Sequence, residues 1–189
     1  FAYSDNGAIS RFGVARLTTV GQPDLTFSGD GELRTGFTGG AATAQAVVVQ
    51  PNGRIVVAGQ VESTTTQDFA LVRYTVAGAL DSSFGNGGRR TTSFGQSDAA
   101  TGVAIQADGR IVAAGYASGS TADFALARYG PGGNLDGSFG NGGRVVTDIS
   151  GEDTGSDVAI SPLDGKILVA GTTYGGATVD IAIVRYLAA

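Results

Sequence analysis

Residues 68–88, DFALVRYTVAGALDSSFGNGG, return almost unchanged at residues 123–143 as DFALARYGPGGNLDGSFGNGG. Degraded copies of the same segment begin at Arg11 and at Asp180. Self-similarity at a fixed interval is the signature of a repeat architecture. This repetition therefore decides how the other features of the chain are interpreted.

The period of the repeat is close to 56 residues, because Gly59, Gly115 and Gly171 follow one another at intervals of 56 residues. Each full repeat holds four recognisable blocks, for example PNGRIVVAG, QDFALVRY, GALDSSFGNGGRRTTSF and DAATGVAIQ. Four blocks of this kind predict four strands.

Three short apolar runs, RIVVAG, RIVAAG and KILVAG, each follow an Asn-Gly or Asp-Gly dipeptide, at residues 52–53, 108–109 and 164–165. Such dipeptides favour the positive φ that hairpin turns require. Another apolar run precedes each dipeptide, so each pair of runs predicts a β-hairpin. The block DFALVRY is apolar on both of its alternating faces, which predicts a strand covered on both sides.

An all-β fold follows from the absence of any sustained helical period. The 32 glycines would also disfavour helices, at about 1 kcal/mol for each helical position. Units of four antiparallel strands are typical of β-propeller blades, whereas the units of a solenoid are usually shorter.

We therefore expect a propeller-type array of about three to four blades, which is incomplete as a closed ring on its own because closed propellers have about four to eight. A single repeat array is predicted over the whole chain. It consists of a partial blade at residues 1–24 and repeats at residues 25–74, 81–129 and 136–189.

The blocks DFALxRY, GxLDxSFGxGG and DGRIVxAG resemble the bacterial delta-60 repeats, a tandem-repeat family with propeller-like blades. The blocks are nearly intact twice within residues 68–143, and the resemblance covers almost the whole chain. The first copy departs from the pattern, with Arg11 in place of Asp, Leu17 in place of Tyr and PDLTFSGDG in place of LDxSFGxGG. The resemblance implies the fold, and it implies no activity because the family carries none that is assigned.

Phe1 stands where the second strand of a hairpin should already be ending, and there is no initiator Met, signal sequence or transmembrane run. We expect the chain to have been cut at this point. An open blade flank exposes strand backbone and apolar side chains. The remaining part of the same polypeptide is expected to complete the ring, with a second copy of the chain as the alternative.

The composition excludes several classes of function. The chain has no Cys, so disulfides and thiolate metal sites are impossible. A net charge of −5 with 15% charged residues argues against binding to nucleic acid, and it equally argues against anionic membranes. A composition with few charged residues and many Gly, Ser, Thr and Asn resembles that of secreted bacterial β-repeat proteins. We therefore expect an extracellular or cell-surface location.

No catalytic site is predicted, because the usual nucleophile and base arrangements need His or Cys and the chain has neither. Carboxylates do pair in the sequence, as Glu152 with Asp153 and Asp148 with Asp157, but acids in a Gly-rich loop are usually solvated. The loop GEDTGSD offers the hard oxygen ligands that Ca²⁺ prefers. Its spacing matches no EF-hand or nonapeptide repeat, so neither a metal site nor a cofactor is predicted.

One arginine recurs in every copy, on the strand face that carries the Phe and Leu of DFALxRY, where an unpaired charge would be costly. The recurring arginines are Arg16, Arg73, Arg128 and Arg185. The acids that repeat in phase with them are Asp24, Asp81 and Asp136, and the alternatives are Asp68, Asp123 and Asp180. We predict that each arginine forms forked hydrogen bonds with a turn aspartate and locks the blade to its neighbour. A ring of ligand-binding arginines is the alternative.

Arg185 has no LDxSFG block after it in this sequence. If the first set of acids is the correct one, its partner must come from elsewhere or from solvent.

The repeated aromatic residues are predicted to be structural rather than sugar-binding. Phe27, Phe84 and Phe139 are expected to plug the space between blades, and Tyr74, Tyr129 and Tyr186 recur at strand ends.

Recognition is expected in the stretches that vary between copies, residues 60–67, 116–122 and 172–179, which would lie along one rim. There, Tyr116 and Tyr174 would stack on a ligand. Ser118 and Thr173 would supply hydroxyl groups beside them.

The sequence therefore predicts a non-enzymatic extracellular interaction or scaffold module that belongs to a larger protein or assembly. The alternative is a lectin-like propeller that binds carbohydrate. That alternative predicts equivalent shallow pockets between blades, each with one aromatic and one polar group.

Overall fold

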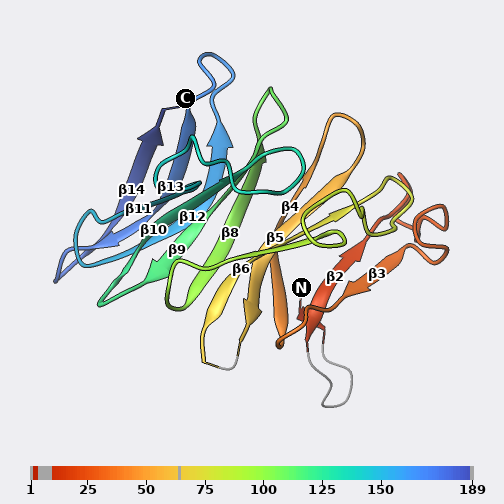
Figure 1. Cartoon of the computed structure of the whole chain (residues 1–189), viewed down its shortest axis with the longest axis horizontal. Helices are drawn as coiled ribbons and strands as arrows, with labels where there is room; N and C mark the ends of the chain where they lie inside the picture. The colour runs from red at the N-terminus through yellow and green to blue at the C-terminus, as the bar shows by residue number, and fades with distance from the viewer. Residues whose placement is uncertain (1, 4–9, 64, 188–189) are drawn as a thin grey trace.

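The structure, a computed structural model, describes residues 2–3, 10–63 and 65–187. In this part of the chain every regular element is a strand, and the strands form four antiparallel sheets that stand side by side (Figure 1). The predicted all-β fold is confirmed. No helix of the described residues has the length and apolar character needed to cross a membrane.

We call the four sheets blades 1 to 4 in chain order. Blade 1 contains β1 (Ala2–Tyr3), β2 (Arg11–Ala15) and β3 (Glu32–Thr35). Blade 2 contains β4 (Ala42–Val49), β5 (Ile55–Glu62), β6 (Gln67–Tyr74) and β7 (Arg89–Thr92). Blade 3 contains β8 (Asp98–Ile105), β9 (Ile111–Ser118), β10 (Ala122–Tyr129) and β11 (Arg144–Thr147). Blade 4 contains β12 (Glu152–Ile160), β13 (Ile167–Tyr174) and β14 (Val179–Tyr186).

The blades are arranged as in a propeller. Strands pair in chain order within each blade, and the first strands β4, β8 and β12 lie next to one another, with β8 between the other two. The sheets follow one another in a row from blade 1 to blade 4, and no ring is closed (Figure 1). Blades 2 and 3 end with their fourth strands, β7 and β11, and so span residues 42–92 and 98–147, which differ from the repeat limits expected from sequence.

Apolar layers fill the space between successive blades. The layer between blades 2 and 3 contains Phe69 and Leu71 of β6, and the layer between blades 1 and 2 contains Ala70 and Val72 of the same strand. All of these side chains are 0% exposed. The prediction that this strand is covered on both sides is confirmed, and burial of each large side chain contributes about 1.5–3 kcal/mol.

The turns between the first two strands of blades 2, 3 and 4 have positive φ at the glycine of each Asn-Gly or Asp-Gly dipeptide. Gly53, Gly109 and Gly165 have φ of 78°, 84° and 69°, but the Asn or Asp before each glycine does not have positive φ. The amide of Gly53 donates to the carbonyl of Gln50, and that of Gln50 to the carbonyl of Arg54. This is the three-residue hairpin in which a left-handed glycine follows a type I turn.

The repeated glycines at residues 59, 115 and 171 are explained by a close approach of two strands. Each lies opposite a bulge in the first strand of its blade, as between Ala44 and Ala46 in β4. A Cβ atom on Gly59 would stand 1.9 Å from the carbonyl oxygen of Thr43. No side chain fits there, so the position requires glycine whatever its φ.

Candidate functional site

Three of the repeated arginines, Arg16, Arg73 and Arg128, lie at one end of their blades, beside the loop that carries the recurring aspartate. The distance from Nε to Oδ2 is 2.8 Å for Arg16–Asp24, 2.8 Å for Arg73–Asp81 and 2.9 Å for Arg128–Asp136. These are the acids of the first predicted set. The alternatives Asp68 and Asp123 lie at the opposite end of the strand, at the start of β6 and β10.

Each of these arginines donates its forked hydrogen bonds to two residues, and not both to one carboxylate as predicted. In blade 2, Arg73 donates from Nε to Asp81 and from Nη2 to the hydroxyl of Ser83, at 3.2 Å. The guanidinium also lies 4.7 Å from the ring centroid of Phe84, which is 0% exposed. The phenylalanine therefore acts both as the predicted plug and as a cation–π partner.

Each of the first two arginines also reaches the following blade. Arg16 donates from Nη1 to the carbonyl of Val76, at 2.6 Å, and Arg73 donates to the carbonyl of Pro131. Arg185 is exposed, and it takes part in no hydrogen bond or ion pair within residues 10–63 and 65–187.

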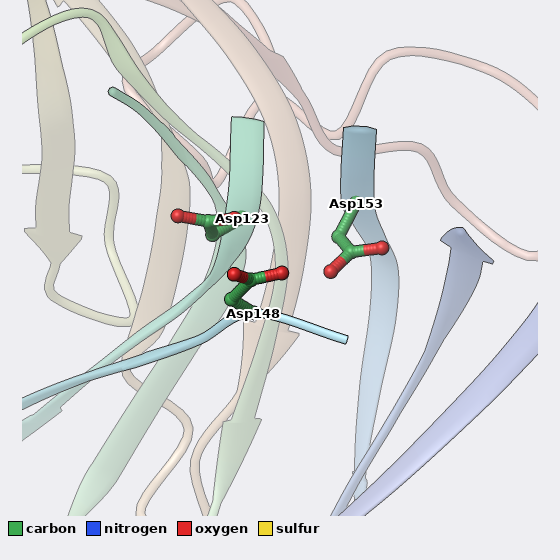
Figure 2. A group of neighbouring side chains, drawn as sticks. All are labelled: Asp123, Asp148 and Asp153. Carbon is green, nitrogen blue, oxygen red and sulfur yellow. The ribbon is translucent and has the colours of Figure 1, made fainter. Parts of the chain in front are cut away.

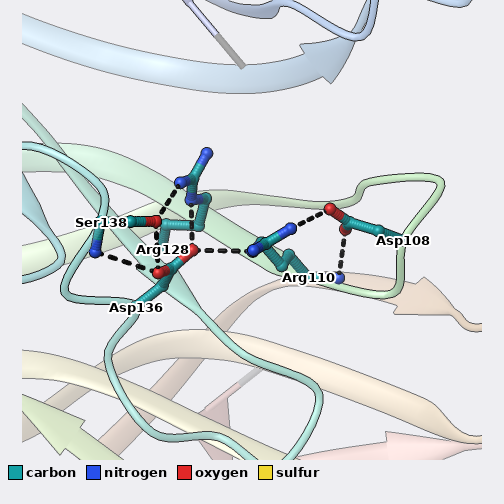
Figure 3. A network of polar contacts seen from close by, with 5 residues as sticks. All are labelled: Asp108, Arg110, Arg128, Asp136 and Ser138. Atoms are coloured by element: carbon teal, nitrogen blue, oxygen red, sulfur yellow. Dashed lines mark hydrogen bonds and ion pairs between the residues drawn. The ribbon is translucent and has the colours of Figure 1, made fainter. Parts of the chain in front are cut away.

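A second arginine, which the sequence analysis missed, pairs with Asp81 and another with Asp136. Arg54 lies 2.8 Å from Asp81, and Arg110 lies 2.7 Å from Asp136 (Figure 3). The signal was the arginine that follows the turn glycine, as in NGRIV and DGRIV. Lys166 takes this position in blade 4 and pairs with Asp164 instead.

The pKa of Asp136 falls to about 2 in this network. Its first cause is the hydroxyl of Ser138, which donates to Oδ1 at 2.7 Å, followed by the Ser138 amide and by Arg128 and Arg110. Burial opposes the fall but does not outweigh these donors. The carboxylate is therefore held ionised as a structural anchor.

The tyrosines at the strand ends contact the preceding blade. The hydroxyl of Tyr129 donates to Thr92 of blade 2 at 2.8 Å, and that of Tyr74 donates to Thr35 of blade 1 at 2.6 Å. Tyr186 bonds to Thr147 in the same manner, at 2.9 Å. The rings of Tyr74 and Tyr129 are 0% exposed, so neither is a platform for a sugar.

At the other end, the contacts of blades 2 and 3 and of blades 3 and 4 carry acids, and no ion pair of the described residues joins these acids to an arginine. Asp98, at the start of β8, is 0% exposed and accepts a hydrogen bond from the amide of Phe94 at 2.6 Å. Burial raises the pKa of Asp98 to about 6; the amide opposes this rise, and the charge of Asp68 adds to it.

Between blades 3 and 4 three carboxylates meet, from Asp123, Asp148 and Asp153 (Figure 2). One oxygen of each lies within 4.8 Å of the others. Burial raises the pKa of Asp123, and Asp148, Asp153 and Glu152 add to the rise. The sequence pairs involving Asp157 are not brought together here, since that exposed residue accepts a hydrogen bond from Val158.

The residues predicted to bind a ligand lie at this same end of the blades. Thr173 and Tyr174 of β13 stand opposite Asp153 and Glu152 in the sheet register, and Tyr174 is 42% exposed. The hydroxyl of Thr173 donates to the carbonyl of Ser150 at 3.1 Å. Residues Tyr116 and Ser118 flank Ala117, which stands opposite both Asp98 and Asp123 in blade 3.

Two repeat-related depressions lie at the opposite end of the first strands. One has a volume of 480 Å³ and is lined by residues of β8, β12 and the turns that follow them, including Gln106, Asp108 and Pro162. The other has a volume of 470 Å³ and lies between the corresponding parts of blades 2 and 3. No aromatic side chain lines either of them, whereas Phe37 and Tyr74 line two smaller depressions between blades 1 and 2.

The comparison with protein families agrees with this architecture. The family described as "Domain of unknown function (DUF5122) beta-propeller" matches four segments of the chain, residues 2–27, 50–84, 106–139 and 163–188. Each segment covers the middle strands of a blade or the loop after them, and together they make up more than half of the sequence. No curated protein matches the chain. The chain belongs to the DUF5122 β-propeller family.

Proposed function

We propose that the protein is a non-enzymatic scaffold module in which propeller blades bind one another, and that the outer face of blade 4 takes a further blade. The observation that carries the proposal is the open face of blade 4, formed by Leu168, Ala170, Ile181 and Ile183. Ile181 is 86% exposed and Ile183 is 68% exposed.

The open face is unusual because the same positions are buried elsewhere in the chain. Ile181 corresponds to Phe69 and Phe124, which are both 0% exposed. Ile183 corresponds to Leu71 and Leu126, which are also 0% exposed. A contiguous apolar surface of this kind marks an interaction site.

The contact between blades 2 and 3 shows which kind of surface would pack against the open face of blade 4. There, Ala125, Ala127 and Tyr129 of β10 belong to the layer that covers Phe69 and Leu71. Small side chains leave room for large ones on the facing sheet, as close packing requires.

Blade 1 presents a matching face. Gly13, Ala15 and Leu17 hold the positions of Ala125, Ala127 and Tyr129, and Leu17 is 58% exposed. We therefore assign the open face of blade 4 to blade 1 of a second copy, packed head to tail. A blade from the remaining part of the same polypeptide is the alternative occupant.

Sedimentation equilibrium of the 18.8 kDa chain over a wide concentration range tests the assignment. We expect self-association that is lost when Ile181 and Ile183 are both replaced by Asp. Leu163→Asp, at a turn residue that is 95% exposed, is the matched control and should associate normally. A chain that stays monomeric throughout, or association that survives the double substitution, would contradict the second-copy assignment.

Two further observations support a non-enzymatic role and a location outside the cell. The chain has neither His nor Cys, and the acids of the arginine networks are held by ion pairs. The low proportion of charged residues, 15%, favours a secreted or cell-surface protein. Detection of the protein in culture medium or on intact cells, against its presence in the cytoplasm, tests the location.

A further inference from the structure

The three carboxylates between blades 3 and 4 form a compact oxygen cluster that the scaffold role does not use. Asp123 is the second residue of β10, Asp148 follows β11, and Asp153 lies in β12, so the cluster joins two blades (Figure 2). One oxygen from each residue lies within 4.8 Å of the other two. Like charges this close repel one another unless a proton or a cation lies between them.

Asp153 gives independent support for a ligand in the cluster. It is 0% exposed, and its Oδ2 accepts hydrogen bonds from the amides of Ile149, at 2.5 Å, and Ser150, at 3.3 Å. Its Oδ1 is buried and has no hydrogen-bond partner in the described part of the chain. Figure 2 shows one oxygen of Asp153 directed towards Asp148. A buried carboxylate oxygen without a partner is costly, and its presence points to a missing positive group.

A second buried oxygen repeats the observation. Oδ1 of Asp123 is buried and has no partner in the described residues. No ion pair in the described part of the chain involves Asp123, Asp148 or Asp153. The charge of the cluster is therefore uncompensated by the described side chains.

The preceding blade contacts show what distinguishes this one. At the contact of blades 2 and 3 the equivalent residues are Asp68, Ser93 and Asp98, and Arg144 donates to the carbonyl of Ser93 at 2.7 Å. At the contact of blades 1 and 2 they are Arg11, Gly36 and Ala42, and Arg89 donates to the carbonyl of Gly36 at 2.9 Å. Carboxylates therefore number none, two and three along the array. Oδ1 of Asp68 and Oδ1 of Asp98 are also buried without a partner in the described residues, so the third carboxylate, Asp148, is what distinguishes the contact of blades 3 and 4.

We propose that Asp123, Asp148 and Asp153 bind a calcium ion that joins blade 3 to blade 4. All three ligands are hard carboxylate oxygens, and Ca²⁺ takes about 6–8 oxygens, including water, in a flexible geometry. Asp148 is exposed, which gives the ion access and leaves coordination positions for water. Mg²⁺ demands a stricter octahedral geometry and binds less well to such a site.

Calorimetric titration of chelator-treated protein with CaCl₂ tests the site, with MgCl₂ as the comparison. We expect one saturable site with a Kd of about 10⁻⁴–10⁻³ M, the range of extracellular modules. Calcium should also raise the unfolding temperature. Asp148→Asn should weaken binding at least tenfold, and it should fold normally because the residue is exposed.

Asp98→Asn is the matched control, since Asp98 holds the position of Asp153 in the preceding blade contact. It should leave the calcium affinity unchanged. Absence of saturable binding to the unsubstituted chain would overturn the proposal. So would equal affinity in Asp148→Asn, or an equal loss in Asp98→Asn, because either result would place the ion elsewhere.

Discussion

Asp136 and Asp98 belong to the same blade and lie at its opposite ends, yet the fold moves their pKa values in opposite directions. Asp136 accepts bonds from Ser138, Arg128 and Arg110, and its pKa falls to about 2. Asp98 is buried with one amide donor and a neighbouring Asp68, and its pKa rises to about 6. The comparison teaches that the balance between burial and hydrogen-bond donors, not residue type or repetition, decides whether the pKa of a repeated aspartate falls or rises.

The largest expected effect comes from removing the donor that is most deeply buried. Arg128→Met should lower the free energy of unfolding by about 3 kcal/mol, because it leaves Asp136 without the partner at 2.9 Å. Urea unfolding at pH 7 measures the loss. Arg16→Met is the control, since the Arg16 side chain is 29% exposed and its pair should contribute about 1 kcal/mol or less. Equal losses in the two variants would show that burial does not set the strength of these pairs.

A smaller effect with a defined pH dependence is expected for Asp136→Asn. A carboxyl group whose pKa is lowered on folding stabilises the protein above the unfolded pKa, and that stability is lost as the pH falls from about 4 to about 2. The variant should therefore be less stable than the parent by about 1.5–3 kcal/mol at pH 7, the value of hydrogen bonds to a charged group. The two proteins should converge at the acid end of a pH series of unfolding curves. A difference that does not shrink on acidification would contradict this assignment.

The smallest effect, and one of opposite sign, is expected for Asp98→Asn. A carboxyl group whose pKa is raised on folding stabilises the protein below the unfolded pKa of about 4, and that contribution is lost as the pH rises to about 6. Asparagine keeps an acceptor for the amide of Phe94 and removes the buried charge. The variant should gain stability relative to the parent as the pH rises from about 4 to about 7. Destabilisation at pH 7 would mean that the ionised carboxylate has a partner.

Local pattern was sufficient to predict the strands and the coverage of β6 on both faces, and it gave the acids beside Arg16, Arg73 and Arg128 as the first of two possible sets. These features repeat within one copy, so the alignment of copies displays them directly. Arg54 and Arg110 repeat as well, but their side chains reach a loop about 26 residues further along the chain, and only the folded blade shows that contact.

The acid cluster could not be predicted in the same way. Asp123 and Asp153 belong to different blades, and Asp148 replaces Ser93 of the preceding contact. The sequence suggested Asp148 with Asp157 because they are close along the chain. The bulge and alternation of β12 leave Asp157 exposed and bonded to Val158, whereas Asp153 points inwards. A signal did exist in the recurrence of Asp68 with Asp98 and of Asp123 with Asp153.

The two kinds of cross-blade bond have a mechanical consequence. Each tyrosine hydroxyl forms a hydrogen bond with the preceding blade, as Tyr129 does with Thr92. Arginines form hydrogen bonds with the following blade, as Arg73 does with the carbonyl of Pro131. A force that pulls on the two ends of the chain must break both kinds of bond before it can unravel a sheet. We expect stretching of single molecules to release the array one blade at a time, with steps of equal length for blades 2 and 3.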